Sequence, residues 1–182
     1  MRRTIRILLA VVATFALTTS AVLASSVHLK GGPSAEPSFV DGGLFLSASS
    51  SLSGLGNGDV QITLTATGNV TSTCTNNGGN AAPGQNPAPI TLTGTQQIPA
   101  NEIKNGTLPF SVRTTSAPAT IAGAPDCPNK TWTESIDSLA FTSATLTVEQ
   151  PIGTVVLTVH CTFSPPTSDG QVPSGTVSCT QS

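Results

Sequence analysis

The sequence has 182 residues, of which 7 are basic and 9 acidic, so that only 9% of them are charged. A chain with so few cations cannot make the several phosphate contacts on which nucleic-acid affinity rests, and it does not suit an anionic membrane surface. Disordered chains are usually rich in charge and poor in β-branched residues. Because Thr, Val and Ile are abundant here, the composition indicates a folded β protein.

The N-terminal segment predicts export. Three arginines precede an apolar run from Ile7 to Leu17, which is too short to span a bilayer. Small residues follow, and we predict a signal peptide over residues 1–24 with cleavage after Ala24. Its removal would leave 4 basic and 9 acidic residues. No later run resembles a membrane span, so we expect a secreted, extracellular protein with no membrane insertion.

The rest of the chain divides into a segment without a pattern, residues 25–38, and one domain, residues 39–182. We expect the first to be flexible. About 158 mature residues are enough for a single domain with its own core. Alternating apolar runs bounded by Gly, Pro and Asn recur through the domain, without a helical period. This pattern predicts an all-β fold, which we interpret as an immunoglobulin-like antiparallel β-sandwich.

The first strand is expected to begin at Phe39 and to continue through Leu44 and Leu46. The next run, residues 60–75, would be either a hairpin turning at Gly68-Asn69 or one long strand. Only one long strand keeps all its apolar residues on one face: Val60, Ile62, Leu64, Ala66, Val70 and Cys74. Because a slip of one residue reverses every side chain, we favour the long strand. Its length exceeds that of a usual strand, so we expect a bend at Gly68, where the chain could pass between sheets.

Later strands are marked by apolar residues at alternate positions: Ile90 to Ile98, Leu108 to Val112, Leu139 to Val148, Val155 to Phe163, and Val177 to Cys179. In the third of these the parity changes between Phe141 and Ala144, which predicts a bulge near Thr142-Ser143. A following hairpin that keeps apolar residues inward sets Val148 opposite Val155.

The four cysteines predict two disulfides, since an even count in an exported chain is typical of disulfide bonding. A zinc site would need paired cysteines or clustered histidines, and neither is present. A hairpin through residues 167–170 places Cys161 opposite Cys179 and Phe163 opposite Val177. Cys74 and Cys127 then remain for each other.

Residues 54–163 resemble a family of small secreted two-disulfide all-β proteins from high-GC Gram-positive bacteria. The resemblance is carried by GLGNGDV at residues 54–60, CTNNGGN at 74–80, KNG at 104–106 and DCPN at 126–129. In such proteins a Cys before a Gly/Asn-rich loop and a later Cys-Pro resemble partners, which agrees with a Cys74–Cys127 bond. The family has no assigned activity, so the resemblance implies no functional residue.

Side chains that could carry catalysis are few. His160 alternates with inward residues and is expected to face outward, so we interpret it as a surface residue without a nucleophile to activate. Glu134 and Asp137 are the carboxylates best placed for glycoside hydrolysis, but a solvated strand end is the plainer interpretation. The acids near Asp59 and Asp126 lack the ladder of a calcium loop. We therefore predict no catalytic, cofactor or metal residue.

Two features could serve binding. Trp132 could stack on a sugar, although five residues after Cys127 it is expected to pack against a disulfide. Threonines alternate through several strands, but no short repeat makes the flat rows of an ice-binding face, so we interpret them as outward strand positions. We expect a monomeric, non-catalytic binding or structural module of the cell surface or the medium. Its candidate ligands are cell wall or glycan; a carbohydrate-binding module using Trp132 and a carboxylate-based hydrolase are the alternatives.

Overall fold

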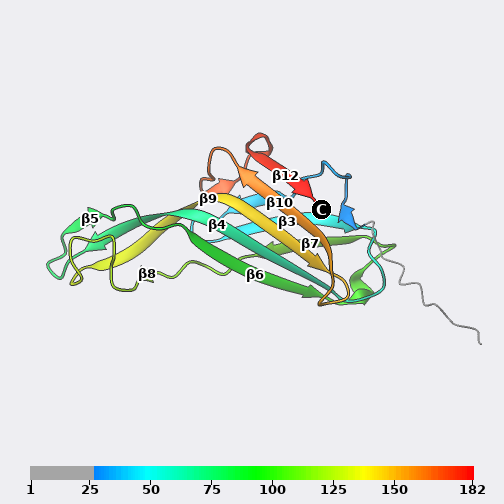
Figure 1. The fold of residues 1–182 in the computed structure, drawn as a ribbon, viewed down its shortest axis with the longest axis horizontal. Helices are drawn as coiled ribbons and strands as arrows, with labels where there is room; N and C mark the ends of the chain where they lie inside the picture. Colours follow the sequence, from blue (N-terminus) through cyan, green and yellow to red (C-terminus); the bar gives the residue numbers. More distant parts are fainter. Residues whose placement is uncertain (1–26) are drawn as a thin grey trace, which may run out of the picture.

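The computed structural model describes residues 27–182, and the predicted signal peptide lies outside them. The described chain consists of strands and turns, with two short 3-10 turns, η1 (Ala100–Glu102) and η2 (Ser174–Thr176). The strands form two antiparallel sheets, which confirms the all-β prediction and gives a β-sandwich (Figure 1).

The smaller sheet, sheet A, is built around β3 (Leu46–Ser53). β7 (Leu108–Arg113) pairs with one edge of β3, and β2 (Ser38–Asp41) and β1 (His28–Leu29) pair with the other. The short strand β11 (Gly170–Gln171) extends the sheet beyond β2.

The larger sheet, sheet B, is built on two very long strands. β4 (Val60–Thr75) and β9 (Thr133–Glu149) pair along their whole length. β6 (Ile90–Ile98) lies beyond β4, and β10 (Val155–Phe163) and β12 (Val177–Gln181) lie beyond β9.

Sheet B is longer than sheet A, and this gives the molecule two parts (Figure 1). In the first part, the body, sheet A covers one end of sheet B. The other end projects past sheet A as an arm, made of residues 69–75 of β4, residues 133–140 of β9 and the segments beside them. Two short strands, β5 (Ala81–Pro83) and β8 (Thr120–Ile121), add to the arm at its two edges.

The core follows the parity of the long strand. Alternate residues of β4 are buried from Val60 to Cys74, which confirms one continuous strand instead of a hairpin at Gly68-Asn69. The pairing with β9 shifts at Gly68, where Thr142 is the extra residue, so the bulge near Thr142-Ser143 is also confirmed. The predicted passage between sheets at Gly68 is wrong, because the partners of β4 on both sides of this residue belong to sheet B.

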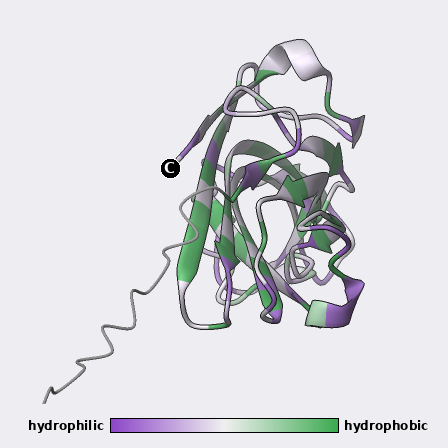
Figure 2. Cartoon of the chain, turned by 90° about the vertical axis from the view of Figure 1, so that its right-hand side faces the viewer, coloured by the Kyte–Doolittle hydropathy of each residue, from purple (hydrophilic) through white to green (hydrophobic). Residues whose placement is uncertain are grey.

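Apolar side chains from both sheets fill the body. Figure 2 shows hydrophobic segments distributed along its strands. Phe39 of β2 and Phe163 of β10 meet edge to face across the two sheets, with ring centroids 5.0 Å apart. At one edge the sheets come into backbone contact: Thr115 N donates a 3.0 Å hydrogen bond to Thr93 O. Beside it, a Cβ atom on Gly94 would lie 1.8 Å from the carbonyl oxygen of Arg113, so only glycine fits there.

Three further sequence predictions need correction. Residues 27–38 are part of the domain: β1 pairs with β3, Val27 and Leu29 are buried, and Leu29 N donates to the side chain of Gln181. The apolar alternation there is too short to indicate a strand. Residues 39–46 form two strands instead of one, because the chain turns at Gly42-Gly43 with Gly43 at φ +79°.

The third correction is the register between β9 and β10. Val148 lies opposite Leu157 instead of Val155, because Val155 pairs with Glu149 and Val156 forms a bulge. Leu157 and the alternate residues after it point inward as predicted, whereas Val155 is 56% exposed and lies outside the core. The pairs Cys161–Cys179 and Phe163–Val177 lie opposite each other as predicted.

Candidate functional site

The inner face of the arm is covered by two irregular segments, residues 84–90 and 117–128, in place of a sheet. Gly84 N donates to Ser72 O of β4 at 2.8 Å, and Gln85 N donates to Asp126 O at 2.9 Å. The disulfide Cys74–Cys127 joins the second segment to β4, which confirms the predicted pairing. The two covering segments are thus fixed to the sheet and to each other.

Glu134 lies under this cover with its side chain fully buried. Ser72 Oγ donates a 2.8 Å hydrogen bond to Glu134 Oε1, and Asp126 N donates to Oε2 at 3.4 Å. Gly84 packs directly against Ser72, since a Cβ atom on Gly84 would lie 2.0 Å from Ser72 Oγ. A buried carboxylate requires such partners. The structure therefore contradicts the interpretation of Glu134 as a solvated strand end and gives it a structural position.

Asp137 lies on the other face of the sheet. It is exposed, and its Oδ2 accepts a 2.7 Å hydrogen bond from Thr73 Oγ1. Ser72 and Thr73 are neighbours in one strand and point to opposite faces. The carboxylates of Glu134 and Asp137, which bind these two hydroxyls, are therefore separated by the sheet and share no catalytic site.

Replacing Glu134 by alanine should destabilise the protein by about 3 kcal/mol, because it leaves a cavity and removes the acceptors of the Ser72 hydroxyl and the Asp126 amide. Asp137→Ala, on the exposed face of the same strand, is the matched control and should change the free energy of unfolding by less than about 0.5 kcal/mol. Urea denaturation of both variants measures the difference. Equal midpoints would show that the buried hydrogen bonds of Glu134 do not stabilise the arm.

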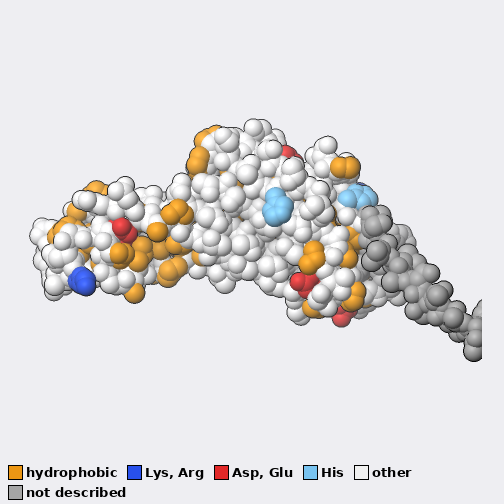
Figure 3. Space-filling model, viewed as in Figure 1, with side chains coloured by type: hydrophobic (Ala, Val, Ile, Leu, Met, Phe, Trp, Pro, Cys, Tyr) orange, Lys and Arg blue, Asp and Glu red, His pale blue; other side chains and the backbone are white. Residues whose placement is uncertain are grey.

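A groove opens between the two covering segments. After the hydrogen bond between Thr115 and Thr93, the segment that follows β7 diverges from β6 and crosses to β9, where Ile136 N donates to Ala119 O at 3.1 Å. The resulting space has a volume of about 440 Å³. It is lined almost entirely by apolar side chains: Ala88, Ile90, Pro118, Ile121, Ala122, Pro125 and Ile136, with Thr120 and Asp126. Figure 3 shows hydrophobic side chains gathered over the arm, whereas the body beside it is mostly polar and uncharged.

Asp126 and Pro125 also line a second, more polar hollow of about 320 Å³ next to the disulfide, with Gln85, Asn86, Cys127 and Pro128. These two residues therefore form the wall between the hollows. The backbone of Asp126 is held on both sides, by Gln85 and by Glu134. No hydrogen bond or ion pair to its half-buried carboxylate is present in the described part of the chain.

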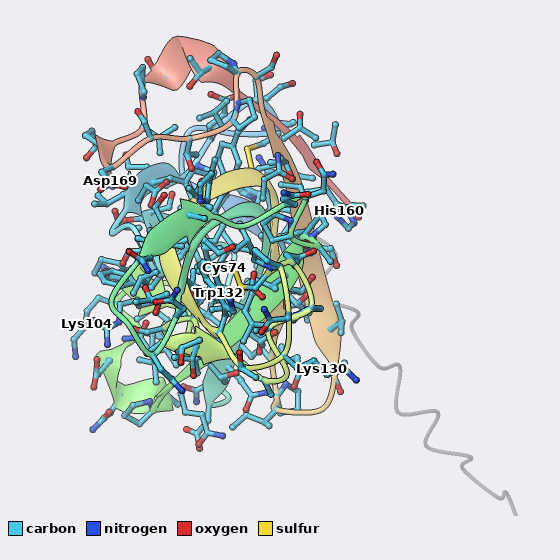
Figure 4. All side chains as sticks on the ribbon, turned by 90° about the vertical axis from the view of Figure 1, so that its left-hand side faces the viewer. Cys74, Lys104, Lys130, Trp132, His160 and Asp169 are labelled. Carbon is cyan, nitrogen blue, oxygen red and sulfur yellow. A yellow bond between two sulfur atoms is a disulfide. The ribbon has the colours of Figure 1, made fainter. Side chains whose placement is uncertain are left out.

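Trp132 lies in the turn between Cys127 and β9, where its backbone amide donates a 3.2 Å hydrogen bond to the carbonyl oxygen of Asn129. Seen from the arm end, it lies near Cys74 in the middle of the arm, with Lys130 to one side (Figure 4). The residue is half-buried. It lines neither hollow, so the side chain proposed from the sequence as a sugar platform is not part of the groove.

His160 is exposed on the outer face of sheet B, as predicted, and its Nδ1 lies 3.1 Å from Thr145 Oγ1. The alternating threonines occupy the same face. They are paired across β4 and β6 by hydroxyl contacts of 3.2, 3.4 and 2.9 Å, at Thr63–Thr95, Thr65–Thr93 and Thr67–Thr91. The face is a hydrogen-bonded polar surface, and it agrees with the interpretation of threonine at outward strand positions.

No family model, curated protein or solved structure matches this chain. Among residues 27–182 no helix is long and apolar enough to cross a membrane. The same residues contain no group of three or more His, Cys, Asp or Glu side chains placed to hold a metal ion.

The groove was missed by reasoning from the sequence, because about half of its lining residues come from loops without periodicity and the others come from three different strands. A compositional signal is nevertheless present. The segments PGQNPAPI (residues 83–90) and APATIAGAPDCP (residues 117–128) are both rich in Pro, and the second is also rich in Ala. Such segments cannot form sheet interiors, since proline has no N–H to donate, yet they carry enough apolar surface to line a groove.

Proposed function

We propose that the protein is a secreted, monomeric, non-catalytic binding module that acts at the cell surface or in the medium, and that the apolar groove of the arm is its binding site. The single observation that supports this most directly is the groove. Ligand sites are typically concave, mostly apolar spaces with a few polar groups. Exposed apolar surface of this kind usually marks a site of interaction. The arm has both a concave, mostly apolar space and exposed apolar surface, whereas the outer face of the body is polar.

Two finer proposals concern relationship and fold. We propose that the chain belongs with the small secreted two-disulfide proteins that it resembles. Two of the motifs that carry the resemblance, CTNNGGN and DCPN, hold the two cysteines of the arm disulfide. We also propose that the body is of the immunoglobulin-like type, which is supported by its two antiparallel sheets packed face to face.

A glycan or a cell-wall polymer is the ligand that we propose to test first. Trp132 supports a carbohydrate-binding module as the second candidate function, because a half-buried indole can still offer one ring face to a sugar. The carboxylate-based hydrolase has less support, since the two acids chosen for it lie on opposite faces of the sheet.

The test is a pull-down of the mature protein on cell walls and insoluble polysaccharides, with the fluorescence of Trp132, the sole tryptophan, as a second signal. We expect retention that Ala122→Arg weakens at least about tenfold, because the new guanidinium must be desolvated in the apolar rim and would compete for Asp126. Thr162→Arg, on the exposed outer face of the body, is the control and should leave retention unchanged.

Three outcomes separate the candidates. Retention lost with Trp132→Ala but kept with Ala122→Arg would favour the carbohydrate-binding module over the groove. Hydrolysis of a retained polymer by the wild-type protein would contradict the non-catalytic proposal. Retention that neither variant weakens would show that the arm is not the binding site.

A further inference from the structure

We propose that the groove of the arm takes a small elongated organic cation, that is, a molecule with an apolar body of about eight carbons and one ammonium group placed against Asp126. This inference rests on the proposed function of the groove as a binding site and names the chemical class of its ligand. It follows from the size of the groove, from the type of its lining and from the charge at its wall.

The size and lining favour an aliphatic body. A volume of about 440 Å³ lies at the lower end of the range for small-molecule sites. The floor is the buried Ile136, and the sides are formed by the half-buried Ile90 and Ile121. The lining has no aromatic ring on which a sugar or a base could stack. Burial of alkyl surface is therefore the main attraction that this groove offers.

The charge favours a cation. Asp126 is the one ionisable residue that lines the groove, and no hydrogen bond or ion pair to its carboxylate is present in the described part of the chain. The nearby Glu134 adds a second acidic group behind the wall, where its Oε2 accepts from Asp126 N. Lys130 lies on the arm but does not line the groove. An ammonium group beside Asp126 would be attracted, whereas an anion would be repelled.

The wall that carries Asp126 is held in place before any ligand arrives. Asp126 O accepts from Gln85 N, Asp126 N donates to Glu134, and the next residue, Cys127, is bonded to Cys74. The backbone that carries this carboxylate therefore loses little conformational freedom on binding. Octylammonium-like molecules thus have both properties that the groove favours, an alkyl chain and a positive charge. Neutral or anionic molecules of the same length have only the alkyl chain.

The test uses the mature protein with two probes of equal chain length, octyltrimethylammonium and octanesulfonate, each kept below its micelle concentration. Amide chemical shifts in a two-dimensional NMR titration give both the affinity and the location. We expect shifts at the groove residues, with the cation binding at least about fivefold more tightly than the anion, as one partly screened charge pair allows. Asp126→Asn should remove most of this preference, and Asp137→Asn, on the opposite face, should leave it unchanged.

Equal affinities for the two probes, or a preference that survives Asp126→Asn, would overturn the assignment of a cationic ligand. Absence of shifts in the groove with either probe would overturn it as well. Neither result would affect the proposed function if Ala122→Arg still weakened retention on cell walls. If the substitution at Ala122 left retention on cell walls unchanged while the NMR titrations showed cation binding in the groove, the proposed function would be contradicted and the ligand class would stand.

Discussion

Gly94→Ala should be the most destabilising single substitution that we consider, with a loss of more than about 4 kcal/mol. The added Cβ would lie 1.8 Å from the Arg113 carbonyl oxygen and 2.7 Å from Thr114 Cα, both of them backbone atoms. β7 cannot withdraw easily, since Arg113 is paired with Ser47 on its other side. Because natural domains are stable by about 5–15 kcal/mol, such a loss would leave a large fraction of the protein unfolded at moderate temperature.

The control is Gly175→Ala. Gly175 lies in η2, a Cβ added to it would have no atom within 4 Å, and it is not among the glycines with positive φ. The free energies of unfolding of both variants, measured in urea, should differ by several kcal/mol. If Gly94→Ala folded with wild-type stability, the close contact between β6 and β7 at this edge of the sandwich would be refuted.

Removing the disulfide Cys74–Cys127 should have the second largest effect. In the chain-entropy model, a sequence separation of 53 residues corresponds to about 4 kcal/mol, and the separation of 18 residues for Cys161–Cys179 corresponds to about 3 kcal/mol. The structure adds to this difference. Cys161 and Cys179 belong to strands that are already hydrogen-bonded neighbours, whereas Cys127 is part of the cover of the arm.

The measurement compares the double variants Cys74→Ala with Cys127→Ala and Cys161→Ala with Cys179→Ala by urea denaturation. We expect the first to be less stable than the second by about 1 kcal/mol. We also expect faster amide hydrogen exchange in the arm of the first variant alone, since its cover is released. The account would be contradicted if the variant without Cys161–Cys179 were less stable than the variant without Cys74–Cys127.

Parity and cysteine register could be predicted because each follows from a strict period. Side chains in a strand alternate between two faces, so the apolar row from Val60 to Cys74 permits one continuous strand and not a hairpin. The pair Cys161–Cys179 follows from the same rule applied to a hairpin. The bulge at Thr142 is predictable as well, because it is the point where the apolar parity changes.

Features that leave parity unchanged could not be predicted. A shift of two residues between β9 and β10 keeps the side chains from Leu157 onward on their faces, so the sequence pattern contains no trace of the bulge at Val156, and only the exposed Val155 departs from it. The burial of Glu134 depends on a second bulge in β9, at Asp137, and on contacts with Ser72 and the backbone of Asp126, which belongs to a loop without a strand period. The groove likewise depends on loops that bring parts of three strands together, and the paths of these loops follow from tertiary contacts instead of periodicity.

The described chain begins and ends on the body, at the side away from the arm (Figure 1). Gln181, the last residue of β12, is hydrogen-bonded through its side chain to Leu29 and to the carbonyl groups of Gly32, Pro33 and Ala35. A tether attached at either end of this chain would therefore hold the molecule by its base and direct the arm outward. Immobilised through a C-terminal tag on a sensor surface, the protein would present its groove to the solution in one uniform orientation.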